Sequence, residues 1–153
     1  TGHVYGYGKS VWAMIDLDTR QPADILAVRG GLITEYIETE YSCPIEKSSR
    51  VKMSADATPI RSIDTYYNDV DINGHINSVK YIEHMLDLWD VAWYKQHRIK
   101  RFEIAYVAES HQGDKLHFYR EQRETETDFN VRITKSNVGR EETEVCRCRV
   151  QFV

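Results

Sequence analysis

Residues 67–89, YNDVDINGHINSVKYIEHMLDLW, join a polar cluster directly to an apolar helical pattern. In the first half of this stretch, polar side chains stand at every second position, and side chains two apart share one side of an extended backbone. A helix would scatter them, so we expect a strand or loop that presents Asp71, Asn73, His75 and Asn77 together. Gly74 permits a sharp bend within this segment.

The second half of the stretch, from Ser78 to about Trp89, predicts an amphipathic helix. Asn77 is of a residue type that caps helix N-termini. Two neighbouring apolar stripes leave only a narrow polar strip, which is typical of a helix that is mostly buried. The stripes are formed by Val79, Ile82, Leu86 and Trp89, and by Tyr81, Met85 and Leu88.

Residues 69–76 also resemble the first part of an EF-hand calcium loop. The position that supplies the bidentate glutamate of such a loop holds Lys80, whose ammonium group would repel calcium. Residues 58–65 also lack the apolar stripe of an entering helix. A calcium-binding module is therefore a distant alternative, and we predict no metal site.

Downstream of the helix, four segments alternate apolar and polar residues, which predicts β-strands separated by turns. Another strand is predicted before the polar cluster, from about Ile60 to Tyr67. One buried helix followed by an antiparallel meander folds most simply with the sheet wrapped around the helix, an α+β hotdog fold. The apolar faces are Phe102, Ile104, Tyr106 and Ala108; Leu116 and Phe118; Phe129, Val131 and Ile133; and Cys146, Cys148, Val150 and Phe152.

The remainder of the chain shows weaker patterns. Residues 6–18 are rich in β-forming side chains, and we interpret residues 1–20 as the trailing strand of a preceding, mostly absent hotdog repeat. Residues 21–57 contain glycine, proline and serine breaks and are predicted to be a linker. Residues 58–153 are then the C-terminal hotdog that carries the polar cluster.

Length and composition describe an ordinary globular protein of 153 residues, 41% hydrophobic and 29% charged. The net charge of −4 argues against nonspecific nucleic-acid binding. The sequence shows no membrane-spanning run and no signal-peptide pattern, so a cytoplasmic location is expected. The three cysteines lack metal or redox spacing and are expected to be reduced thiols.

Glu109 is predicted to close the first strand after the helix, on the face opposite the apolar residues of that strand. If it lies against the polar cluster, the combined groups suit acyl hydrolysis. Glu109 or His75 would take a proton from water, and Asn73 would donate a hydrogen bond to the carbonyl or hold the water. Asp71 would orient a neighbour, and the first helical N–H groups would help to hold the oxyanion. Taken singly, each residue has an ordinary role in a turn, a cap or a strand end.

Residues 71–83, DINGHINSVKYIE, closely resemble the D-x-N-x-H-x-N-x-V-K-Y-I segment of acyl-acyl-carrier-protein (acyl-ACP) thioesterases of plants and bacteria. Residues 10–20, SVWAMIDLDTR, resemble the S-V-W-x-M-x-x-x-x-T-R segment near the end of the first repeat of that family. Residues 106–110, YVAES, lie where the family has Y-R-R-E-C. The resemblance thus extends across most of the chain.

This resemblance implies a tandem hotdog enzyme that hydrolyses fatty acyl-ACP to free fatty acid and ACP, with no metal or organic cofactor. The catalytic residues of the family correspond here to Asp71, Asn73, His75 and Glu109. Plant members have a cysteine after the glutamate, where this chain has Ser110. That difference favours attack by water over a cysteine acyl-enzyme.

The resemblance also implies a partner, an acidic carrier protein, which an acidic enzyme must meet with a local basic patch. We expect this patch to include Lys95, Arg98, Lys100 and Arg101. Pairing with a second hotdog unit, either an N-terminal repeat of the same protein or another copy, is expected as well. The alternatives are an acyl-CoA thioesterase of the same fold and a noncatalytic acyl-binding or assembly domain.

Overall fold

The computed structural model describes residues 2–19, 21–48, 51–54, 57–139 and 141–153. The chain divides into two units, Thr1–Lys47 and Ser48–Val153. The regular element of the first unit is a kinked 3₁₀ helix, η1 (Ile25–Tyr36). Asp24 caps it by accepting a hydrogen bond of 2.9 Å from the N–H of Leu26.

The strand predicted over residues 6–18 is not formed in the part of the first unit that the structure describes. The backbone there makes a single antiparallel bridge, between Ile15 and Pro22. The Asp16 carboxylate instead closes a turn by accepting the N–H of Thr19 at 2.7 Å. The physical reason is that a strand needs a neighbour for its backbone N–H and C=O groups, and local sequence does not supply one.

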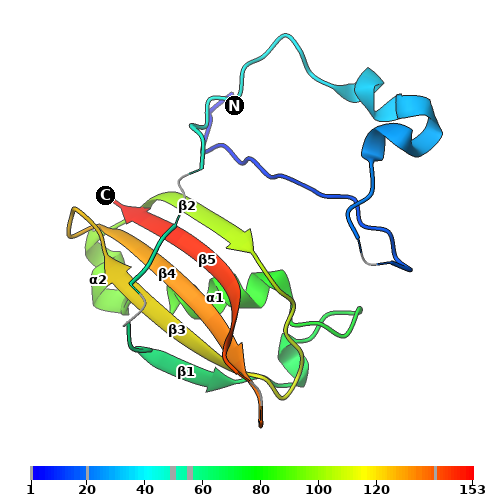
Figure 1. Cartoon of the computed structure of the whole chain (residues 1–153). Helices are drawn as coiled ribbons and strands as arrows, with labels where there is room; N and C mark the ends of the chain where they lie inside the picture. Colours follow the sequence, from blue (N-terminus) through cyan, green and yellow to red (C-terminus); the bar gives the residue numbers. More distant parts are fainter. Residues whose placement is uncertain (1, 20, 49–50, 55–56, 140) are drawn as a thin grey trace. The chain divides into compact units, whose positions relative to one another are not determined.

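The second unit contains a five-stranded sheet in the order β1-β3-β4-β5-β2, with every neighbouring pair antiparallel. Its helices lie between β1 and β2 in the chain, and Figure 1 shows α1 and α2 behind the sheet. The elements are β1 (Arg61–Asp64), η2 (Tyr67–Asp69), α1 (Ser78–Leu86), α2 (Val91–Gln96), β2 (Ile99–Tyr106), β3 (Lys115–Gln122), β4 (Asp128–Ser136) and β5 (Thr143–Phe152).

The predicted meander is correct for β3, β4 and β5 but wrong for β2, which pairs with β5 at the far edge of the sheet. Residues 107–114 between β2 and β3 are not a tight hairpin, because they pass beside the start of α1. There the N–H of Ile76 donates to the carbonyl of Ser110 at 2.8 Å. Glu109 therefore lies in this connection, beyond the end of β2, and not in the strand itself.

Helix α1 packs one apolar stripe into the core of the second unit. Met85 and Tyr81 are 0% and 3% exposed, whereas Val79 on the other predicted stripe is 51% exposed. The helix is therefore less completely buried than its sequence predicts. The apolar faces predicted for the last three strands are confirmed, because Leu116, Phe118, Phe129, Val131, Ile133, Cys146, Cys148, Val150 and Phe152 are all buried. All three cysteines are free thiols.

Candidate active site

The polar cluster folds into a tight turn that Asp71 holds together. Oδ1 of Asp71 accepts hydrogen bonds from the N–H groups of Asn73 at 2.8 Å and His75 at 3.2 Å. The N–H of Asp71 donates in return to the carbonyl of His75 at 2.8 Å. Gly74 has a φ of +83°, in the left-handed region that glycine adopts without steric cost. Asp71 thus fixes the backbone that presents the other two side chains.

These contacts also decide the protonation state of Asp71. Burial alone would raise the pKa of its carboxyl group, but hydrogen bonds from Asn73 and His75, together with the charge of His75, hold the pKa below its ordinary value of 3.8. Asp71 is therefore a hydrogen-bond acceptor at neutral pH. In the structure it holds the turn by accepting these N–H groups.

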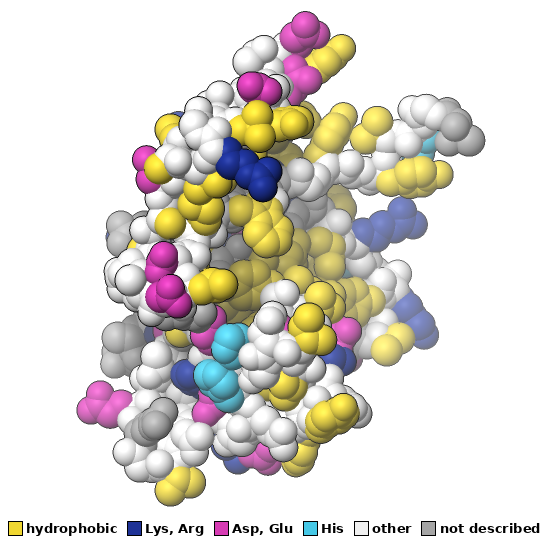
Figure 2. Space-filling model, turned by 90° about the vertical axis from the view of Figure 1, so that its right-hand side faces the viewer, with side chains coloured by type: hydrophobic (Ala, Val, Ile, Leu, Met, Phe, Trp, Pro, Cys, Tyr) yellow, Lys and Arg dark blue, Asp and Glu magenta, His cyan; other side chains and the backbone are white. Residues whose placement is uncertain are grey.

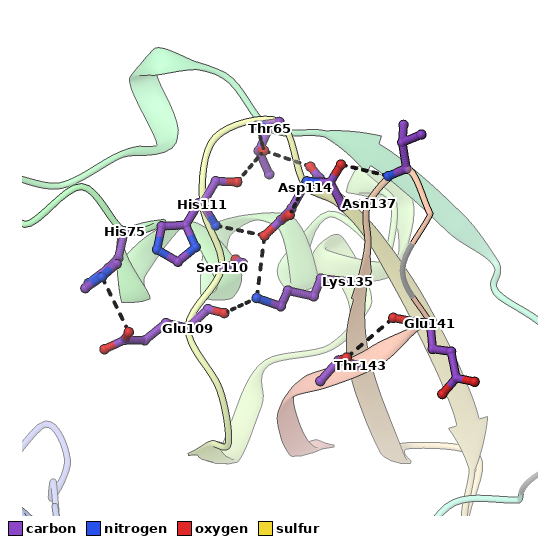
Figure 3. A network of polar contacts seen from close by, with 12 residues as sticks. Thr65, His75, Glu109, Ser110, His111, Asp114, Lys135, Asn137, Glu141 and Thr143 are labelled. Carbon is purple, nitrogen blue, oxygen red and sulfur yellow. Dashed lines mark hydrogen bonds and ion pairs between the residues drawn. The ribbon is translucent and has the colours of Figure 1, made fainter. Parts of the chain in front are cut away.

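The imidazole of His75 meets the carboxylate of Glu109, with Nε2 and Oε2 3.4 Å apart. Their side chains are 29% and 52% exposed, and Figure 2 shows histidine side chains gathered at the molecular surface. Figure 3 shows these two side chains pointing toward one another, one from the turn before α1 and one from the connection after β2. The structure thus brings together two of the groups that the sequence predicts to meet, at a place that solvent reaches.

Ser110 is buried behind this pair. Its hydroxyl is hydrogen-bonded to the hydroxyl of Tyr81 on α1, and the two residues are 0% and 3% exposed. Burial raises the pKa of Tyr81 to about 12, so its hydroxyl stays protonated. Because the Ser110 hydroxyl faces the core and is occupied there, it is not placed to attack a substrate.

Asn77 caps α1, as its residue type predicts. Its side-chain oxygen accepts the N–H of Val79 at 3.0 Å, and its carbonyl accepts the N–H of Lys80 at 2.9 Å. Both donors are therefore engaged, and the prediction that the first helical N–H groups hold an oxyanion is wrong for these two. The Asn73 side chain is exposed, and its amide donates a hydrogen bond to the Asp71 carboxylate.

His111, an exposed residue, lies beside His75, and the sequence gives no reason to expect it there. Its ring lies edge-on to that of His75, with centroids 5.0 Å apart and an interplanar angle of 80°. The two rings lie close together because of the path of residues 107–114, and the local sequence does not predict that path. The site therefore contains a second imidazole beside the predicted one.

The basic residues predicted to dock a carrier protein lie toward the start of β2, whereas Glu109 follows its end. At about 3.3 Å per residue along a strand, the two ends of β2 are roughly 20 Å apart. The Nε of Arg101 donates to Glu103 at 2.8 Å, so part of the positive charge is already neutralised. The docking role of Lys95, Arg98, Lys100 and Arg101 stays a prediction.

The described residues contain no group of three or more His, Cys, Asp or Glu side chains arranged to hold a metal ion. They also contain no helix that is long and apolar enough to cross a membrane. The Asp71 carboxylate, which the calcium interpretation would need as a ligand, is turned to the N–H groups of its own turn.

Comparison with known proteins adds an independent line of evidence. Residues 50–152 match the model of the acyl-ACP thioesterase C-terminal domain. The chain belongs to this family. The family and the hotdog fold that the sequence predicts are thereby confirmed.

Solved and curated relatives agree with this assignment. An acyl-ACP thioesterase from Bacteroides thetaiotaomicron is 44% identical, with a TM-score of 0.78, over 91% of this chain and 53% of that one. A 12:0-ACP thioesterase from Umbellularia californica shares the fold, with 20% identity and a TM-score of 0.69 over 91% of this chain and 52% of that one. The chloroplastic palmitoyl-acyl carrier protein thioesterase of Arabidopsis thaliana is 29% identical over 112 residues, 71% of this chain and 27% of the relative. The chain thus spans about half the length of these solved thioesterases, and less of the Arabidopsis protein.

Proposed function

We propose that this acyl-ACP thioesterase domain hydrolyses the thioester of a fatty acyl chain on ACP and releases free fatty acid and ACP. The observation that carries the proposal is the 3.4 Å approach of His75 Nε2 to Glu109 Oε2 at a solvent-exposed edge of the fold. Hydrolysis needs a base for the attacking water and a donor for the developing oxyanion. The substrates named for the relatives, palmitoyl-ACP and 12:0-ACP, support a fatty acyl group.

In the proposed mechanism, the Glu109 carboxylate accepts a proton as water attacks the carbonyl carbon of the thioester. Negative charge then collects on the former carbonyl oxygen, to which the Asn73 amide donates a hydrogen bond. As the carbon–sulfur bond breaks, the proton passes through the Glu109–His75 pair to the departing sulfur. Asp71 keeps the turn in shape throughout. No covalent acyl-enzyme is required, in keeping with the buried hydroxyl of Ser110.

The test is the release of free fatty acid from a panel of acyl-ACPs by the full-length protein and its variants. Glu109→Gln and His75→Ala should each lower kcat by about 100-fold or more, since general acid–base groups contribute roughly 10²–10⁴-fold. Glu83→Gln is the matched control, because Glu83 is an exposed helix residue paired with Lys80 at 2.9 Å. Undiminished turnover in the Glu109 and His75 variants would contradict the assigned roles.

The same assay separates the alternative functions. Faster hydrolysis of acyl-CoA than of acyl-ACP with the same acyl chain would indicate an acyl-CoA thioesterase. Binding of an acyl chain without turnover of either substrate would indicate a noncatalytic acyl-binding or assembly domain. Selective turnover of acyl-ACP is the expected result.

We also propose that the domain pairs with a second hotdog unit, which comes either from the same protein or from another copy. Strand β2 lies at the edge of the sheet, and an edge strand offers backbone groups to another strand. The roughly twofold greater length of the solved relatives leaves room for such a unit within one protein. The molar mass of the full-length protein in solution distinguishes a monomer containing both units from a dimer.

A further inference from the structure

The connection that carries Glu109 is anchored at its far end by Asp114. Oδ2 of Asp114 accepts the N–H of His111 at 2.9 Å, and Oδ1 accepts the side-chain amide of Asn137 at 3.0 Å. The Asp114 side chain is 9% exposed. A buried carboxylate with several donors is a rigid support, because moving any partner leaves a charged group poorly satisfied.

Thr65, the residue after β1, fastens the same end of the connection from the other side. Its hydroxyl lies 3.0 Å from the carbonyl of His111 and 2.7 Å from the carbonyl of Asp114, either of which can accept its proton. The hydroxyl oxygen also accepts the N–H of Gly113 at 3.0 Å. Residues 111–114 are therefore held both by the side chain of Asp114 and by the hydroxyl of Thr65.

Lys135 on β4 links Asp114 to Glu109 within the connection between β2 and β3. Its Nζ donates to the backbone carbonyl of Glu109 at 2.6 Å and lies 3.6 Å from Oδ2 of Asp114. Figure 3 shows the side chain of Lys135 reaching across from its strand to both groups. The hydrogen bond is short and charge-assisted, and such bonds are about twice as strong as neutral ones.

The charge on Asp114 favours this arrangement. Burial alone would raise the pKa of Asp114, but hydrogen bonds from the His111 N–H and the Asn137 amide, with the charge of Lys135, hold the pKa below its ordinary value of 3.8. Asp114 is thus ionised at neutral pH and attracts the Lys135 ammonium group. The hydrogen bond from Lys135 is to the backbone carbonyl of Glu109, so Lys135 acts on the backbone of that residue.

We propose that Lys135, oriented by Asp114, is a positioning residue for thioester hydrolysis, because it pins the Glu109 backbone so that the carboxylate meets His75. The Glu109 side chain is 52% exposed and its carboxylate meets His75 at 3.4 Å, so the place of the Glu109 backbone sets where that carboxylate can reach. An error of about 1 Å in the place of a catalytic group can cost on the order of 100-fold in rate. The inference rests on the proposed function.

The first test measures kinetics of Lys135→Met in the full-length protein. Methionine keeps an unbranched apolar stem and removes the ammonium group, so kcat for acyl-ACP should fall by about 10- to 100-fold with KM unchanged. Lys135→Arg keeps a cationic donor and should recover part of the loss. The matched control is Lys115→Met on β3, because Lys115 is half exposed and its ion pair at 3.7 Å is with Asp64, outside this network. It should leave kcat unchanged.

A double-variant experiment separates positioning from general support of the fold. In the Glu109→Gln background, Lys135→Met should cause little further loss, because the carboxylate that it positions is already gone. An equal loss of kcat in both backgrounds would overturn the proposal, as would an unchanged kcat in Lys135→Met alone.

A second measurement does not depend on turnover. Amide hydrogen exchange of peptides covering residues 107–114 should be faster in Lys135→Met than in the unmodified protein, while exchange in β5 stays the same. Unchanged exchange in residues 107–114 would overturn the positioning role even if the protein hydrolyses acyl-ACP. Faster exchange in a protein that hydrolyses no thioester would instead contradict the proposed function and leave the anchoring by Lys135 standing.

Discussion

Replacement of Tyr81 by phenylalanine removes one hydroxyl group from the core directly behind the active site. Phenylalanine keeps the volume of the ring, so the change creates no large cavity. It leaves the Ser110 hydroxyl, which is 0% exposed, without its partner on α1. An unsatisfied buried polar group costs about 1–3 kcal/mol, and the free energy of unfolding should fall by that amount. For a unit of about 100 residues, each kcal/mol lowers Tm by roughly 4–8 °C.

The partner substitution supplies the control. Ser110→Ala removes the side-chain partner of the Tyr81 hydroxyl and should also destabilise the protein, whereas the double variant removes both hydroxyls, so neither is left without the other. Urea unfolding at pH 7 should therefore give a double variant that is more stable than the sum of the single effects by about 1–3 kcal/mol. Simple additivity would show that this hydrogen bond is not the stabilising contact.

The same variants test the chemistry. If water attacks the thioester, Tyr81→Phe together with Ser110→Ala should retain most of the turnover of the unmodified protein, because neither hydroxyl touches the substrate. If Ser110 were a nucleophile, turnover would be lost in Ser110→Ala and would not return in the double variant. That loss, in a protein that remains folded, would refute the reasoning.

The raised pKa of Tyr81 adds a prediction about alkaline pH. The folded-state pKa of about 12 lies above the ordinary value of 10.0, so the stabilisation is complete below pH 10 and is lost as pH rises toward 12. A shift of this size corresponds to about 3 kcal/mol. Tyr81→Phe should lack this alkaline loss of stability, as measured by urea unfolding between pH 9 and about 11.

Three further predictions concern the core, the acid limit of stability and the carrier protein. Met85→Ala empties a fully buried site on α1 and should lower the free energy of unfolding by about 2–5 kcal/mol, seen as a lower urea midpoint with an unchanged m-value. Arg149, hydrogen-bonded to Asp128, holds the pKa of that carboxyl below its ordinary 3.8. The resulting stabilisation is complete above that value and is lost as pH falls below it, so Asp128→Asn should flatten the acid side of a plot of unfolding free energy against pH. Charge reversal at Lys100 and Arg101 should raise KM for acyl-ACP but not for a small thioester. Equal effects on both substrates would contradict the docking hypothesis. The single variant Lys100→Glu is the control, because it leaves intact the hydrogen bond that Arg101 donates to Glu103 within β2.

Local features of the fold follow from the sequence alone. The period-two alternation predicts β3, β4 and β5 and their buried faces, and Asn77 marks the start of α1. The turn from Asp71 to Gly74 is equally local, because a carboxylate that accepts nearby N–H groups and a glycine with positive φ need no distant partner. Such features are predictable because the interacting groups lie within a few residues of each other.

Strand pairing is harder to predict from the sequence. The alternation in residues 99–106 predicts a strand but not that it pairs with β5 rather than β3, since either neighbour satisfies the same backbone groups. Residues 6–18 carry β-forming side chains and yet form no strand in the described part of the first unit, because propensity does not provide a partner.

The site shows the same division between local and distant interactions. The motif from Asp71 to His75 determines which chemical groups are available, and the family resemblance assigns Glu109 to them. Only the tertiary structure decides that residues 107–114 pass the start of α1, which places Glu109 at 3.4 Å from His75 and buries Ser110. The contact of Lys135 with Glu109 joins residues separated by 26 positions. A hydrogen bond over that separation depends on how the strands are arranged in space, which no periodicity in the sequence encodes.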